Sequence, residues 1–188
     1  MIRTREVTVT YLEMLSPADL RPSQRRVIDF NVVRVAEPAP EFARFLYTAI
    51  GSKWYWIDRL PWALAEWQAH VARPEVETWV GYVNGTPCGY FELECEPGPE
   101  VQVTYFGLLA SYIGRGLGGQ LLTAAVQRAW ALSPRRVWVH TCTLDGPTAL
   151  ANYQARGFRV YKRETANREL DETPPEPWPG AVRNGGSA

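Results

Sequence analysis

Residues 111–130, SYIGRGLGGQLLTAAVQRAW, place four glycines within six positions, directly before an apolar helical repeat. Each glycine costs roughly 0.5–1 kcal/mol of backbone entropy relative to alanine, and a plain turn into a helix needs only one or two. Leu117, Leu121, Leu122 and Val126 then share one helical face, with polar residues opposite. The stretch therefore predicts a helix whose first turn is approached closely by a ligand, and phosphate is the usual ligand there.

The glycines allow more than one interpretation. Gly114, Gly116 and Gly119 fit the dinucleotide pattern G-x-G-x-x-G, but that motif should open a βαβ unit and be followed about 20 residues later by an acidic residue. A P-loop is excluded because no Lys-Ser or Lys-Thr pair follows the glycines. A glycine-rich helix start without any ligand is the remaining alternative.

The segments around the loop predict one mixed α+β domain. Three apolar runs precede the loop, at 76–83, 88–96 and 101–110, and Asn84-Gly85 marks a hairpin between the first two. Further upstream we expect a strand at 6–14 and helices at 40–50 and 60–71, while 23–35 is ambiguous. After the loop follow a helix, a strand at 135–142, a helix at 146–157 and a strand at 158–165. Irregular structure is expected in the Pro- and Gly-rich tail, residues 167–188, so the folded domain is assigned to 1–166.

Composition excludes several classes of protein. Twenty basic residues balance twenty acidic ones in 188 residues, which argues against a protein built to cover nucleic acid or an acidic membrane. Three cysteines, an odd number, and two histidines make a disulfide framework and a metal site unexpected and favour a cytoplasmic location. No export signal or membrane span is expected, since no run approaches about 18 apolar residues.

The stretch LLASYIGRGLGGQLL resembles the acyl-CoA-binding motif [RQ]-x-x-G-x-[GA] of the GNAT superfamily of N-acetyltransferases. The later GPTALANYQARGF is similar to the closing helix of that family, with a Tyr four residues before Gly-Phe. The order of elements also agrees over roughly residues 5–165. The resemblance implies a central, mostly antiparallel twisted sheet flanked by helices, with the cofactor in a cleft between the two central strands.

The resemblance also implies the cofactor and its contacts. Acetyl-CoA would place its pyrophosphate at the loop and its pantetheine arm along the preceding strand, in contact with Leu108, Leu109, Ile113, Gly114, Arg115, Gly116, Leu117, Gly118 and Gly119. Two positions depart from the family pattern. Ile113 stands where Arg or Gln is usual, a loss for which Arg115 could compensate, and Gly146 stands where Asn is frequent.

The resemblance implies transfer of an acetyl group to a primary amine, with Tyr153 at the position of the acid that protonates the leaving thiolate. Glu92 is the candidate general base, although it could equally lie on a solvated strand face. His140 is expected to be a structural, hydrogen-bonded histidine rather than a base.

The acceptor is an unidentified small molecule or peptide. Trp54 and Trp56, in a tryptophan-rich segment, are candidate acceptor contacts, or they belong to the core of two short helices. Asp58 is expected to be solvated, although it could attract an amine. A homodimer is compatible with the resemblance. The alternative function is a non-catalytic acyl-CoA-binding or interaction domain, and an NAD-dependent enzyme is a third hypothesis.

Overall fold

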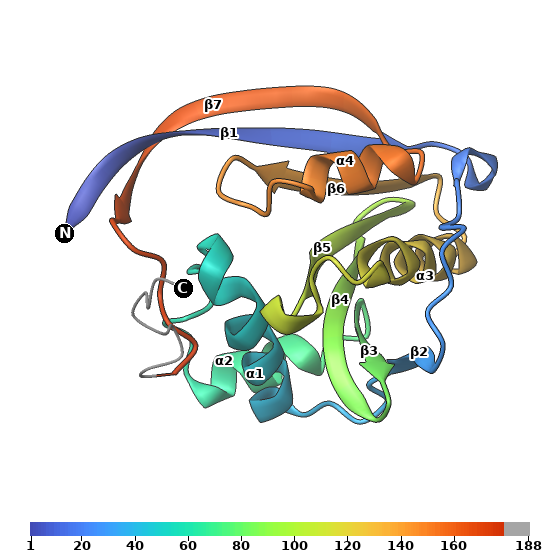
Figure 1. The fold of residues 1–188 in the computed structure, drawn as a ribbon, viewed down its shortest axis with the longest axis horizontal. Helices are drawn as coiled ribbons and strands as arrows, with labels where there is room; N and C mark the ends of the chain where they lie inside the picture. Colours follow the sequence, from blue (N-terminus) through green and yellow to red (C-terminus); the bar gives the residue numbers. More distant parts are fainter. Residues whose placement is uncertain (179–188) are drawn as a thin grey trace.

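A seven-stranded sheet organises the chain in the computed structural model, which describes residues 1–178 (Figure 1). The strand order is β2-β3-β4-β5-β6-β1-β7, and every neighbouring pair is antiparallel except β5 and β6. This confirms the expected mixed α/β fold with a mostly antiparallel sheet. The strands are β1 (Ile2–Met14), β2 (Phe30–Arg34), β3 (Val76–Val83), β4 (Thr86–Glu96), β5 (Glu100–Leu108), β6 (Arg136–Cys142) and β7 (Arg159–Asp171).

The two parallel strands, β5 and β6, separate halfway along their length. β5 and β6 pair from Glu100 opposite Arg136 to Val103 opposite Val139. β5 then continues to Leu108 and β6 to Cys142 beyond this pairing. The sheet therefore opens at its centre, between the strands where the sequence predicts a cofactor cleft.

Helices cover both faces of the sheet because successive strand residues point to opposite sides. On β4, Tyr90 packs with Leu46 and Ile50 of α1 (Pro40–Gly51), whereas Phe91 packs with Leu121 of α3 (Leu117–Ala131). α2 (Leu64–Val71) packs against α1 and β3, and α4 (Ala149–Ala155) packs against α3. Short 3-10 turns lie at Pro17–Asp19, Ser52–Trp54 and Ala110–Tyr112.

The last strand is longer than the sequence predicts. β7 runs to Asp171, so the expectation of irregular structure from Asn167 onward is wrong for residues 167–171. The reason is a distant partner: β1 begins at Ile2 rather than at Glu6, and Ile2 and Glu6 pair with Asp171 and Asn167. Residues 172–178 form no helix or strand, as expected, and Trp178 is 58% exposed. The rest of the predicted tail, residues 179–188, lies outside the described part of the chain.

The long β1–β7 ribbon is tied to Tyr55, which follows the Ser52–Trp54 turn. In Figure 1 both strands extend beyond β6 toward the segment that follows α1. The Tyr55 hydroxyl donates to the carbonyl oxygens of Asp171 and Glu172, both at 3.1 Å. Among residues 1–178, no helix is both long and apolar enough to cross a membrane.

Candidate active site in the central cleft

A cleft of about 1180 Å³ occupies the opening between β5 and β6. Its walls come from the outer halves of these two strands, the glycine loop, α4 and the segment from Trp54 to Trp62. The cleft thus gathers the predicted cofactor loop, the predicted acid and the predicted acceptor residues into one space.

The glycine loop has the geometry that its sequence predicts. Gly114 and Gly116 have φ values of 81° and 84°, in the left-handed region that glycine adopts without a steric penalty. Gly116 is the N-cap of α3 and no side chain caps the helix, so the first N–H groups of α3 are available to a ligand. Leu117 is buried in the core and offers only its backbone, whereas Ile113 is exposed. The site is therefore an anion cradle made of backbone N–H groups and a helix dipole.

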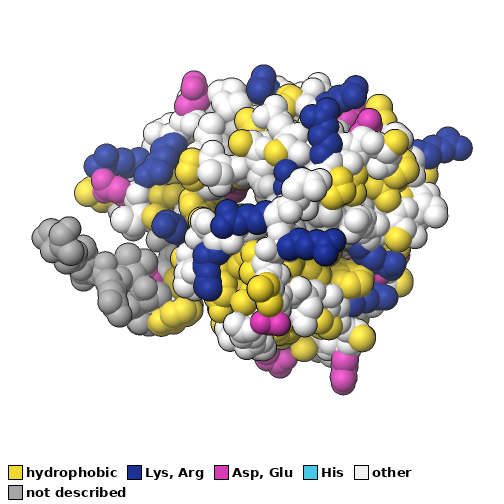
Figure 2. Space-filling view, turned by 45° about the vertical axis from the view of Figure 1, so that its right-hand side comes forward, with side chains coloured by type: hydrophobic (Ala, Val, Ile, Leu, Met, Phe, Trp, Pro, Cys, Tyr) yellow, Lys and Arg dark blue, Asp and Glu magenta, His cyan; other side chains and the backbone are white. Residues whose placement is uncertain are grey.

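Arginines from distant segments surround this cradle. A Cβ on Gly116 would collide with the side chain of Arg25, and one on Gly119 would lie 2.5 Å from Arg156. The Arg156 Nε is buried without a hydrogen-bond partner in the described residues. Figure 2 shows Lys and Arg side chains gathered around a hollow on this face. The sequence analysis missed Arg25 and Arg156, because nothing local links either of them to the loop.

Within residues 1–178, the outer half of β5 has no strand partner on the side of the cleft, because its pairing with β6 ends at Val103. The Leu109 N–H donates to the Cys88 carbonyl oxygen on β4 at 2.9 Å. Because backbone groups alternate along an antiparallel strand, those of Phe106 and Leu108 point the other way, to the side from which β6 has departed. Of the two predicted contacts, Leu108 thus directs its backbone groups to the cleft, whereas the N–H of Leu109 is hydrogen-bonded within the sheet.

Tyr153, the predicted acid, lines the cleft from α4. Its ring is buried and packs edge-on against Phe106 and Phe158. Within residues 1–178, the Tyr153 hydroxyl makes no hydrogen bond. Burial, with a smaller contribution from the charge of Asp145, raises the pKa of Tyr153 well above the ordinary value for tyrosine. The phenol therefore keeps its proton at neutral pH and can donate it.

Glu92, the predicted base, lies in a buried ion pair. It is 3% exposed, and its two oxygens accept hydrogen bonds from Arg59 at 3.0 and 2.8 Å, with His70 Nε2 at 3.2 Å from Oε1. Burial raises the pKa of Glu92, but the hydrogen bonds from His70 and Arg59 outweigh it and the net pKa is lowered. It does not line the cleft. This geometry suits a structural ion pair and leaves no free oxygen for an incoming amine.

Trp54 and Trp56, the predicted acceptor contacts, both line the cleft. Trp56 is wedged against two glycines: a Cβ on Gly51 would overlap its ring, and one on Gly107 would lie 3.5 Å from it. Trp54 reaches across the cleft and packs against Gly146 of the β6–α4 loop, 3.5 Å from where a Cβ would lie. The Trp54 ring therefore contacts the position where the resembling family often has Asn.

Asp58 and His140, for which the sequence analysis expected a solvated and a structural role, both line the cleft. Asp58 accepts hydrogen bonds from the hydroxyls of Tyr47, at 2.9 Å, and Tyr105. His140 follows directly after the last β6 residue that pairs with β5, and its Nδ1 lies 3.2 Å from Gln102 Nε2. His140 is exposed to the open cleft, but the atoms around it still lower its pKa by partial desolvation, and the charges of Asp145 and Asp58 oppose this shift. His140 is therefore neutral at pH 7 and can accept a proton.

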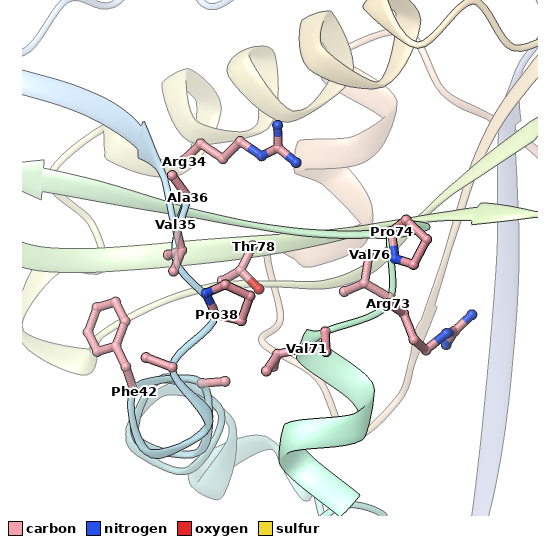
Figure 3. A pocket seen from close by; sticks show the side chains of 13 residues that line it. Arg34, Val35, Ala36, Pro38, Phe42, Val71, Arg73, Pro74, Val76 and Thr78 are labelled. Carbon is pink, nitrogen blue, oxygen red and sulfur yellow. The ribbon is translucent and has the colours of Figure 1, made fainter.

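A second cavity of about 180 Å³ lies between the start of α1, the end of α2 and the strand edge (Figure 3). Its titratable lining residues are Arg34 and Arg73, which pair with Glu77 and Glu94. Its lining residues include no Asp, Glu, His, Cys or Tyr, whereas the central cleft is lined by several of these.

Several solved structures share this fold. A GCN5-related N-acetyltransferase from Sphaerobacter thermophilus is 15% identical, with a TM-score of 0.66 over 91% of this chain and 54% of its own. One from Kribbella flavida is 18% identical, with a TM-score of 0.63 over 87% and 58%. An aminoglycoside acetyltransferase from an uncultured soil metagenomic sample is 15% identical, with a TM-score of 0.58 over 68% and 87%. This chain thus spans little more than half the length of the first two proteins.

No curated protein matches this sequence. The sequence does match the Acetyltransferase (GNAT) family over residues 40–158, which is more than half of the chain and includes the glycine loop, both parting strands and Tyr153. The solved structures establish the fold, and the family match covers all the residues that line the cleft except Arg25. The chain belongs to the GNAT acetyltransferase family.

Proposed function

We propose that this protein transfers an acetyl group from acetyl-CoA to a primary amine by direct attack of the amine, in the cytoplasm. The observation that carries the proposal is the cleft itself. It joins an anion cradle at the start of α3 to an unpaired strand edge on β5, with a protonated tyrosine in its wall. The cradle suits a pyrophosphate, the strand edge suits an extended arm that carries amides, and the tyrosine suits a thiolate leaving group.

The residues present fit coenzyme A at both ends of the cleft. The buried, partnerless Arg156 Nε and the open N–H groups of α3 suit a pyrophosphate, and Arg25 and Arg115 add positive charge. The free groups of Phe106 and Leu108 would hydrogen-bond the pantetheine amides as a neighbouring strand does. When bound, the cofactor supplies an acetyl thioester.

The chain supplies three functions for the transfer. The Leu108 N–H is the candidate donor for the negative charge that develops on the carbonyl oxygen. We assign to His140 the uptake of the proton that the amine loses, at Nδ1, which would exchange its contact with Gln102 Nε2 for that proton. Glu92 is the poorer candidate because Arg59 binds both of its oxygens and it does not line the cleft. Tyr153 donates its proton to sulfur as the C–S bond breaks and the C–N bond forms.

The direct test is thiol release from acetyl-CoA in the presence of a panel of amines. Tyr153→Phe should keep the KM for acetyl-CoA and lower kcat by about 10²-fold or more, the usual contribution of a general acid. Gly116→Val should raise the KM for acetyl-CoA, because its φ of 84° and the Arg25 side chain both disfavour a β-branched residue.

The control outcomes separate the alternatives. Acetyl-CoA binding without thiol release from any amine would favour a non-catalytic acyl-CoA-binding domain. Thermal stabilisation by NAD but not by acetyl-CoA would favour a dinucleotide enzyme. Unchanged turnover in Tyr153→Phe would remove that residue from the acid role.

A further inference from the structure

The charges in the cleft are distributed unevenly. At the glycine loop, Arg25 and Arg156 contribute positive charge. At the opposite end, which the segment from Trp54 to Trp62 lines, the basic residues are already paired. Arg59 bonds Glu92 with both of its terminal nitrogens, and His70 shares that carboxylate. The acceptor end therefore gains no net positive charge from these residues.

Arg73 is neutralised in the same way by Glu94, at 2.6 Å. Asp58 is different, because no Lys, Arg or His among residues 1–178 forms an ion pair with it. Its hydrogen-bond donors are the neutral hydroxyls of Tyr47 and Tyr105. Asp58 is thus the carboxylate at this end of the cleft whose charge is left for a ligand.

The two tyrosines hold the carboxylate without neutralising it. Burial raises the pKa of Tyr47 and of Tyr105, and the charge of Asp58 raises both further, so both remain protonated donors. The Tyr47 ring is itself fixed by Trp67, 5.6 Å away and edge-on. Asp58 is therefore oriented before a ligand arrives, which lowers the entropic cost of binding.

Aromatic rings flank this carboxylate. Tyr105 stacks edge-on with Trp56 at 4.8 Å between ring centroids, and Trp56 also contacts Tyr47 at 5.7 Å. Trp56 packs directly on Gly51, where a Cβ would overlap its ring. The Arg59 guanidinium already lies over the Tyr105 ring, 4.4 Å from its centroid. The Asp58 carboxylate and the Trp56 ring are therefore the groups that would attract a cation and contact a flat apolar group.

We propose that the acceptor is an aromatic amine that is cationic at neutral pH, such as an arylalkylamine, and that Asp58 binds its ammonium group beside Trp56 and Tyr105. This inference rests on the proposed acetyltransferase function and names its substrate class. Asp58 is the specificity-determining residue, and it excludes acceptors that carry a carboxylate next to the amine.

The test uses the full chain with acetyl-CoA and matched amines. Phenethylamine and phenylalaninamide are cationic and aromatic, aniline is aromatic but neutral, and phenylalanine adds a carboxylate. Thiol release gives KM for each amine and for acetyl-CoA, and calorimetric titration gives the affinity for phenethylamine with or without turnover. Asp58→Asn is the isosteric variant, Tyr105→Phe removes one donor to Asp58, and Glu37→Gln removes an exposed carboxylate elsewhere.

We expect Asp58→Asn to raise the KM or Kd for phenethylamine roughly 10- to 100-fold, the usual loss for a charge-assisted contact. The KM values for aniline and acetyl-CoA should stay the same. Tyr105→Phe should give a smaller rise in the KM for phenethylamine, and Glu37→Gln should give none. Melting temperatures near that of the wild type would show that the variants are folded.

The outcomes distinguish this inference from the proposed function. Binding of phenethylamine that depends on Asp58, without thiol release from any amine, supports the inference and overturns the enzyme. Turnover that favours aniline or phenylalanine, or that is unaffected in Asp58→Asn, overturns the inference and leaves the enzyme. If the cationic amines are neither bound nor turned over, the inference is also overturned.

Discussion

Replacing Glu92 with glutamine separates the two roles that this carboxylate could have. The substitution keeps the shape of the side chain but removes its charge, and it leaves the charge of Arg59, which is 6% exposed, without its partner. Removing one member of a buried ion pair costs about 3–5 kcal/mol. Since 1 kcal/mol corresponds to roughly 2–4 °C in a protein of this size, the melting temperature should fall by roughly 6–20 °C.

The assay is urea unfolding of wild type and Glu92→Gln at a series of pH values. The pKa of Glu92 in the folded protein lies below its ordinary value of 4.5. The ionised carboxylate therefore contributes its full stabilisation above about pH 4.5, and this contribution is lost as the pH falls through the folded pKa. The free energies of unfolding of the two proteins should accordingly converge in acid.

A double variant provides the control. Arg59→Met combined with Glu92→Leu removes both charges, and such apolar replacements of buried ion pairs are often neutral or stabilising. We expect it to recover most of the stability that Glu92→Gln loses. A Glu92→Gln protein that unfolds like the wild type but has lost kcat would refute this reasoning, and Glu92 would then be the general base.

Three further predictions concern the walls of the cleft. Gly51→Ala should destabilise the protein by about 1–3 kcal/mol by overpacking against Trp56 and should raise KM for the amine but not for acetyl-CoA, as urea unfolding and steady-state kinetics would show. The acidic limb of the kcat–pH profile should have its midpoint below the ordinary histidine value of 6.5, and Asp145→Asn should move it lower still, because Asp145 raises the pKa of His140; a midpoint above 6.5 would exclude His140 as the base. Arg156→Gln should raise KM for acetyl-CoA about tenfold with kcat unchanged, and equal KM values would show that this arginine does not reach the phosphates.

The sequence predicts those features of the site that depend on local backbone conformation. The left-handed Gly114 and Gly116, the start of α3 and the Asn84-Gly85 turn all follow from what glycine permits at neighbouring positions. Tyr153 in the cleft wall follows from its place on a short helix within a motif that resembles a known family.

Features that depend on distant partners are not predictable in this way. Glu92 alternates with apolar residues as a solvated strand residue would, and only the tertiary structure brings Arg59 and His70 to it. The extension of β7 to Asp171 depends on Ile2 at the other end of the sequence. A pattern of apolar and polar residues identifies which positions are buried, but it does not identify which buried charges meet.

The parting of β5 and β6 creates a window through the sheet rather than a groove on its surface. One end of the window is the pairing of Val103 with Val139. Phe106 and Tyr153 lie on the α3 face, whereas Gly107 and Trp56 lie on the α1 face. Side chains from both faces of the sheet therefore line the same cleft, so a substitution on either the α1 face or the α3 face changes the shape of one shared space.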